Sequence, residues 1–267
     1  MLHLNPVTAT VNVKNEKECP MSFAKLRSCM AAASLLLASP ALAQQSNWDT
    51  TFTFYLFAAE TDTSISTPLG PIDSTLSFKD ALENLDFAFM GSLEARNGPW
   101  TLIGDYAHTS LGFSNSTPGP AFSGLNADVK LQVANAYALY EAHRTPALSF
   151  DVGAGVRYFN ADVQLDLVPG AAAGRTATFD DSWFDPVLAA RLSFPISDKW
   201  SGRVFFDYGG FRSDSQSFQA VLTARYAFND DWSLVIGYRY LDLKHGPAND
   251  ELDFSQSGPL VGVSYKF

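Results

Sequence analysis

An alternation of apolar and polar residues, repeated in segment after segment, constrains the fold of this chain more than any other feature. In the last segment Val263, Tyr265 and Phe267 fall on one face of an extended chain, and Ser264 and Lys266 fall on the other. This period of two predicts β-strands with one apolar and one polar face. The polar faces hold mostly Gly, Ser, Ala and Thr, and only 17% of all residues are charged. We therefore expect these faces to line a crowded interior, because the exposed face of a soluble β-sandwich would carry more charge.

Ten such segments are separated by connections that alternate in length. The short connections are built from turn-forming residues, as in 97–99, 144–146, 197–198 and 229–231. The long connections lie near 60–84, 113–126, 161–181 and 245–256. Short turns at one end and long loops at the other are typical of transmembrane β-barrels. The predicted strands cover residues 48–59, 85–96, 100–112, 127–141, 147–160, 182–195, 199–211, 217–228, 232–244 and 257–267.

The predicted fold class is therefore all-β: a closed, antiparallel transmembrane β-barrel of about ten strands, with short periplasmic turns and longer extracellular loops. An eight-stranded barrel is the alternative if the segment 127–141 does not span the membrane, since Asn135 interrupts its lipid-facing side. Barrels of eight strands are just filled by their interior side chains, and ten strands leave only slightly more room.

The first 43 residues have the organisation of an export signal. Lys25 and Arg27 precede an apolar stretch at 29–38, and Ala41-Leu42-Ala43 resembles a cleavage site. We predict a signal peptide over 1–43, with Met21 as an alternative start, and a barrel domain over 44–267. Cleavage of the signal peptide would remove both cysteines of the chain and change the formal net charge from −10 to −12. So acidic a chain offers no basic surface for nucleic acid.

Tryptophan positions support a membrane-spanning barrel. Trp48, Trp100, Trp200 and Trp232 each open a predicted strand, the last three directly after a short turn. They are expected to form an aromatic girdle at the periplasmic rim, where amphipathic rings are favoured. Trp183 is expected to mark the opposite rim.

The carboxy terminus carries a resemblance to a known class of protein. Val263, Tyr265 and the final Phe267 resemble the terminal assembly signal of Gram-negative outer-membrane barrels. The stretches 85–91, 185–191, 207–211 and 237–241 resemble a little-characterised, opacity- and porin-like family of small proteobacterial outer-membrane barrels. The resemblance implies an outer-membrane location, with membrane lipid, lipopolysaccharide and the barrel assembly machinery as partners. It implies no substrate.

Several charged residues have the parity of the inward faces. In so narrow a lumen they must be paired, because an isolated buried charge is costly. Arg191, Arg203 and Arg225 are expected to lie close together and to need a carboxylate such as Glu94. They form either an ion-paired plug or an arginine-lined constriction that passes small anions. The predicted lumen charges are Glu94, Asp105, Asp151, Arg157, Asp185, Arg191, Arg203, Asp207, Arg225 and Arg239.

Candidates for catalysis are few. Of the histidines after residue 43, His143 lies beside a short turn and His108 has lipid-facing parity near the outer rim. His245 shares a loop with Asp250 and Asp253, and acid–base work there is less favoured than a solvated loop histidine. We expect no catalytic site, cofactor or metal, and the sequence makes no prediction of an oligomeric state.

One short segment departs from the β pattern. Phe78, Leu82 and Leu85 recur at helical spacing, which predicts a short amphipathic helix at the extracellular mouth, with strand as the alternative. The expected function is a narrow passive pore for small solutes or a structural wall protein with an ion-paired lumen. The alternatives are surface ligand binding or adhesion through the loops and, less favoured, an outer-membrane hydrolase.

Overall fold

A computed structural model describes residues 48–67, 70–117, 120–212, 214–246 and 252–267 of the chain. Asn47–Phe267 form one compact unit. The predicted signal peptide lies outside the described residues. In the part of the chain that is described, no helix is both long and apolar enough to cross a bilayer.

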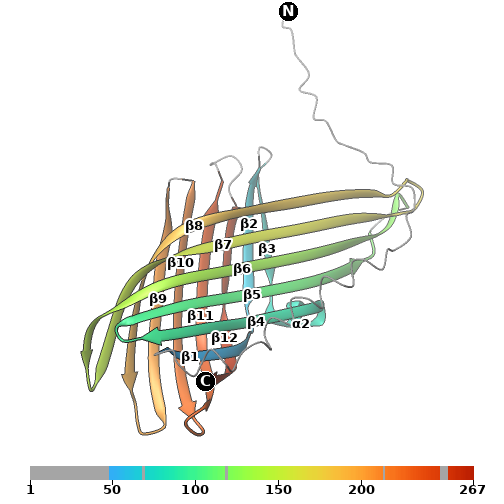
Figure 1. Cartoon of the computed structure of the whole chain (residues 1–267). Coiled ribbons are helices and arrows are strands. Elements are labelled where there is room, and N and C mark those ends of the chain that lie inside the picture. Colours follow the sequence, from blue (N-terminus) through green and yellow to red (C-terminus); the bar gives the residue numbers. More distant parts are fainter. Residues whose placement is uncertain (1–47, 68–69, 118–119, 213, 247–251) are drawn as a thin grey trace, which may run out of the picture. The chain divides into compact units, whose positions relative to one another are not determined.

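Antiparallel strands close into a ring whose order follows the sequence (Figure 1). β1 pairs with β4 on one side and with β12 on the other, and consecutive strands from β4 to β12 pair with each other. Among the described residues, β2 pairs with β12 and β3, so these two strands extend the sheet outside the ring. The elements are β1 (Asp49–Phe57), β2 (Glu60–Thr67), β3 (Gly70–Leu76), α2 (Phe78–Glu83), β4 (Leu85–Asn97), β5 (Trp100–Asn115), β6 (Phe122–Thr145), β7 (Leu148–Pro169), β8 (Arg175–Pro195), β9 (Trp200–Arg212), β10 (Ser215–Ala227), β11 (Trp232–His245) and β12 (Leu252–Lys266).

The expected ring of ten strands is confirmed, and the eight-stranded alternative is wrong. The segment 127–141 lies within β6, which pairs with β5 and β7 along its length. Asn135 does not interrupt the lipid-facing side as expected. It lies on the inward face, 4% exposed, in register with Asp105 and Arg157 on the neighbouring strands.

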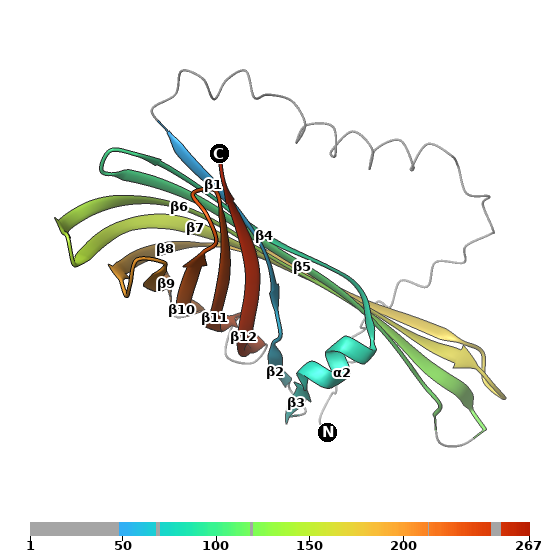
Figure 2. The same ribbon diagram turned by 90° about the horizontal axis from the view of Figure 1, so that it is seen from below.

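All four of the expected long loops are partly β-structure, and two of them, 161–181 and 60–84, differ most from the prediction. Residues 161–169 and 175–181 extend β7 and β8, whose pairing continues to Leu167 and Arg175. The region 60–84 holds β2, β3 and α2, and Ser77 caps this predicted helix by accepting a hydrogen bond from the backbone N–H of Asp80. Seen from below, β5 to β8 run past α2 and beyond the ends of β9 to β12 (Figure 2). The part of a strand that extends beyond the membrane keeps its backbone hydrogen bonds but needs no apolar face. The alternation of apolar and polar residues therefore does not predict that part of the strand.

The outward face carries the aromatic residues expected at the rim with the short turns. Trp48, Trp100 and Trp232 are 37%, 50% and 47% exposed, and Phe267 projects outward beside Tyr265. Three of the tryptophan rings contact a tyrosine ring on the neighbouring strand in tilted or edge-on geometry, in the pairs Trp100–Tyr140, Trp200–Tyr226 and Trp232–Tyr265. Trp183 was predicted to mark the other rim, and this is wrong, because its side chain is 7% exposed and packs inside the ring against Phe159. Phe184, its neighbour, takes the outward position against Tyr158.

Candidate functional site

The inside of the ring holds a layer of charged and polar side chains at its middle. All ten charged residues predicted for the lumen lie on inward faces. Five of them are at most 1% exposed: Asp151, Arg157, Asp185, Arg191 and Asp207. They gather into three groups along the axis: a central layer, a cluster toward the short turns and a cluster toward the long loops.

The heart of the central layer is an ion pair between β7 and β9. Arg157 Nη2 lies 2.8 Å from each carboxylate oxygen of Asp207. Asp207 also accepts hydrogen bonds from the Tyr137 hydroxyl at 2.7 Å and the Gln219 amide at 2.9 Å. Because Asp207 is fully buried, these donors replace the water that an ionised carboxylate needs.

A second ion pair completes the central layer. The Arg239 guanidinium donates to the Tyr55 hydroxyl at 3.0 Å, and Tyr55 donates to Asp105 at 2.7 Å. Asn135 joins the two pairs: its oxygen accepts from Arg157 Nε at 2.8 Å and its nitrogen donates to Asp105 at 3.2 Å. Sequence parity identified the charged members, but Asn135, Tyr55, Tyr137 and Gln219 were missed. Their signal was the same inward parity, which marks polar residues as well as charged ones.

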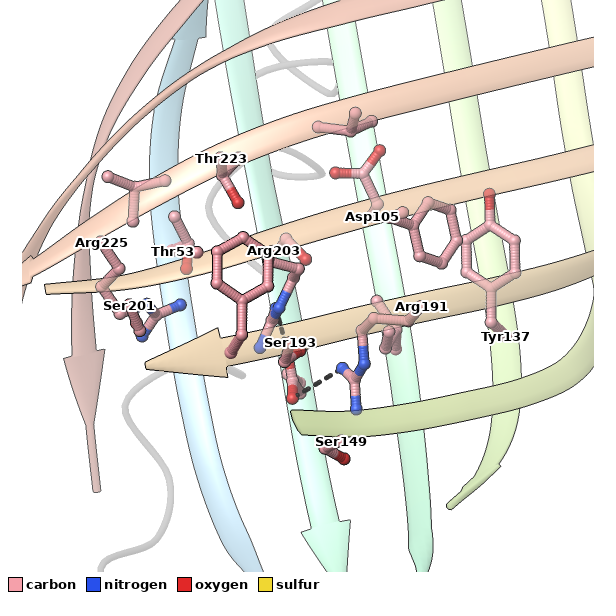
Figure 3. Close-up of a pocket in the computed structure, with 18 of the residues that line it drawn as sticks. Thr53, Asp105, Tyr137, Ser149, Arg191, Ser193, Ser201, Arg203, Thr223 and Arg225 are labelled. Carbon is pink, nitrogen blue, oxygen red and sulfur yellow. Dashed lines mark hydrogen bonds and ion pairs between the residues drawn. The ribbon is translucent and has the colours of Figure 1, made fainter. Parts of the chain in front are cut away.

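Toward the short turns, Glu94 bridges two arginines as expected. Its carboxylate lies 2.9 Å from Arg191 Nη1 and 2.8 Å from Arg203 Nη1 (Figure 3). Arg191 also pairs with Asp151 at 2.6 Å. Arg225 points into the same space, but among the described residues no carboxylate lies within ion-pair distance of it. The expected group of three arginines is therefore two paired side chains and one lone cation.

Two cavities lie on either side of the central layer. A short-turn cavity of about 410 Å³ is lined by Glu94, Arg203 and Arg225, and an outer chamber of about 740 Å³ is lined mainly by apolar side chains. On β6, Tyr137 lines the first cavity and Leu131 the second, with Asn135 of the central layer between them. Central-layer side chains line the first cavity and not the second, so the layer lies between the two cavities, whose linings share Leu260 alone among the described residues.

Toward the long loops, Asp185 is held by neutral donors. Ser215 donates to it at 2.6 Å and the Trp183 indole at 3.1 Å. His245 stacks on Trp183 with ring centroids 4.1 Å apart, and its Nδ1 lies 3.4 Å from the Ser215 hydroxyl. The expectation of a solvated loop histidine is wrong, because His245 ends β11 and its half-buried ring stacks on Trp183. Asp253 lies on β12 and pairs with Lys244. Asp250 lies outside the described residues.

Ser215, His245 and Asp185 have the residue types of a hydrolytic triad but not its order of hydrogen bonds. In such triads the aspartate orients the histidine, and the histidine accepts the serine proton. Here the serine donates directly to the aspartate and is 1% exposed. Of the remaining histidines, His108 lies beside Phe87 and His143 is exposed at the short-turn end. The hydrogen bonds of Ser215, His245 and Asp185 therefore favour a structural role for this group over a catalytic one.

Comparisons with known proteins bear on the family and on the fold. The family model described as "Outer membrane protein beta-barrel domain" matches residues 29–267. The outer membrane protease OmpT from Escherichia coli has a similar fold, with a TM-score of 0.53 and 7% identity over 82% of this chain and 96% of that chain. Neisserial surface protein A gives a TM-score of 0.35 and 16% identity over 83% and 98% of the two chains. Ail of Yersinia pestis gives 0.36 and 11% over 82% and 98%. No curated protein sequence matches the chain.

Proposed function

The chain belongs to the outer membrane protein β-barrel family, and we propose that it is a non-enzymatic barrel whose lumen is closed, a structural wall protein and not a pore. The observation that carries this proposal is the central layer between the two cavities. Its partners are then the lipids of the outer membrane, lipopolysaccharide included, and, through the terminal Phe267, the barrel assembly machinery.

The central layer joins opposite walls of the barrel. It draws Tyr55 from β1 and Asp105 from β5, and it receives further side chains from β6, β7, β9, β10 and β11. Arg157, Asp207 and Arg239 are at most 4% exposed. An ion that crossed this layer would have to replace charge-assisted hydrogen bonds away from bulk water, which is costly. This supports a lumen that is closed at its middle.

The arginines that would select anions are mostly engaged elsewhere. Glu94 and Asp151 neutralise Arg191, and Glu94 also neutralises Arg203. Only Arg225 offers an unpaired charge among the described residues that line the short-turn cavity. A constriction that passes anions needs a ring of free cations at its narrowest level. The pairing therefore favours the plug over the anion pore.

Single-channel recording tests the proposal directly. Protein purified from outer membranes and reconstituted in a planar bilayer is expected to be silent. The double variant Arg157→Ala/Asp207→Ala removes the central ion pair and is expected to open a passage between the cavities. Arg203→Ala is the control, because it neutralises a charge in the short-turn cavity and leaves the central layer intact.

The outcome that overturns the proposal is equally direct. Steady openings of the wild-type protein with an anion preference that Arg203→Ala abolishes would establish an arginine-lined pore. Heat-dependent gel mobility shows for each variant that the barrel is folded, so silence from unfolded protein is not mistaken for closure.

A further inference from the structure

The outer chamber is apolar and large. Its volume of about 740 Å³ lies within the ~300–1,000 Å³ range of pockets that hold small molecules. Leu111, Phe159 and Phe254 line it from inside the barrel and are at most 4% exposed. Its polar lining consists of threonine, serine, asparagine and glutamine, and none of the described residues that line it is charged. The chamber therefore suits an uncharged, apolar occupant.

The barrel wall is incomplete beside this chamber. The pairing of β1 with β4 ends at Phe54 and Gly91, and β2 then pairs with β12 and β3. Residues 85–90 of β4 pair only with β5, so no ladder joins β3 to β4 among the described residues. The short helix α2 lies between the two strand edges (Figure 2). The wall therefore has a side opening between β3 and β4, where backbone hydrogen bonds between strands are missing among the described residues.

The opening reaches the surface that faces lipid. Leu56 and Val261 lie opposite each other on β1 and β12, are 52% and 49% exposed, and line the chamber. Phe78 and Leu82 of α2 are also exposed and line it. The same cavity therefore touches lipid-facing side chains at one end and buried side chains at the other. It is continuous with the apolar surface that the bilayer covers.

We propose that the outer chamber binds an acyl chain of a lipid from the surrounding outer leaflet, which enters sideways between β3 and β4. The inference goes beyond the closed lumen proposed above and does not depend on it. The chain would lie with its methyl end against Leu111 and Phe254, while its headgroup stays at the membrane surface. Transfer of the methylene groups from the bilayer costs little because the chamber wall is mainly apolar, and the chain then covers apolar wall that water would otherwise contact.

Charge near the opening favours a membrane lipid over a free fatty acid. Asp80 and Glu83 lie on α2, and Asp86 follows it. Lys79, the one cation of α2, pairs with Glu83 at 3.6 Å. An acidic rim repels a free carboxylate that approaches from water. A chain that slides in from the bilayer brings no such charge past the rim.

Photo-crosslinking distinguishes the occupants. The full protein is reconstituted in phosphatidylethanolamine vesicles doped with the same lipid carrying a diazirine at the chain terminus, irradiated, and mapped by peptide mass spectrometry. Adducts are expected on the inward-facing residues Leu111, Leu131 and Phe254, which lipid outside the barrel cannot touch, in addition to outward-facing residues.

Two matched substitutions on β6 test the site. Ala127→Trp fills the chamber from its inward face and is expected to reduce the inward adducts at least tenfold. Ala138→Trp adds the same bulk to the lipid-facing side of the same strand and is expected to leave them unchanged.

Three results overturn the proposal. The first is wild-type adducts confined to outward-facing residues, and the second is inward adducts that Ala127→Trp leaves intact. The third is inward labelling by a diazirine fatty acid added from water but not by the vesicle lipid, which would identify a water-borne solute. A conducting wild-type barrel would overturn the closed lumen without affecting these adducts, so the two proposals fail separately.

Discussion

The ion pair between Arg157 and Asp207 allows a quantitative test of the central layer. Both side chains are at most 1% exposed, and Asp207 accepts four contacts from Arg157, Tyr137 and Gln219. Asp207→Leu leaves a buried guanidinium without its counter-charge, which costs about 3–5 kcal/mol of unfolding free energy. Arg157→Met leaves the carboxylate and is expected to cost a similar amount.

The double variant Arg157→Met/Asp207→Leu separates the energetic contribution of the ion pair from that of the neighbouring hydrogen bonds. Replacing a buried ion pair by apolar residues of similar volume is often neutral or stabilising. Tyr137 and Gln219 would each lose an acceptor and Asn135 would lose a donor, at roughly 1 kcal/mol apiece. We therefore expect the double variant to cost about 3 kcal/mol, well below the sum of the two single variants.

Reversible urea unfolding in lipid vesicles, followed by tryptophan fluorescence, measures these differences. The exposed pair Lys79–Glu83 is the control, and Lys79→Ala is expected to cost less than about 0.5 kcal/mol. Single variants of the buried pair that cost under about 1 kcal/mol would show that water reaches it. A double variant that costs the sum of the single ones would show that the two charges are not coupled. Either result would refute the closed central layer.

Three further predictions use the same unfolding assay. Arg225→Ala is expected to be neutral or stabilising because the guanidinium has no ion-pair partner among the described residues, whereas Arg203→Ala is expected to cost about 1 kcal/mol of unfolding free energy. A larger loss of stability in Arg225→Ala than in Arg203→Ala would contradict the pairing. Gly153→Ala places a Cβ 2.0 Å from a carbonyl oxygen of β6 and is expected to lower the folded fraction. A Cβ at Gly104 has no atom within 4 Å, so Gly104→Ala is expected to leave the folded fraction unchanged, and equal effects of the two variants would contradict the register. Ser215→Ala is expected to cost about 1–3 kcal/mol because a buried carboxylate loses a donor, and a neutral result would mean that water takes its place.

The charged members of the site could be predicted because parity is a local property. A strand places alternate residues on opposite faces, so Arg157 and Asp207 were assigned inward without knowledge of their partners. The prediction for Asn135 is wrong because it treats the residue as part of the lipid-facing side, although Asn135 shares inward parity with Tyr137. The prediction for Trp183 is wrong because tryptophan is common at membrane rims, whereas this side chain is buried and packs against Phe159 and His245 inside the ring.

By itself the sequence left ten and eight strands as alternatives, but it determined the all-β class, the short turns and the two faces of most strands. These depend on residues close together in the chain, and the lipid on one side enforces the period of two. Only the tertiary structure decided which charges meet across the lumen, that the two cavities are separated, and that the wall opens between β3 and β4. Those outcomes depend on the register between strands and on where a ladder ends, because the partners lie on different strands and no local pattern encodes their pairing.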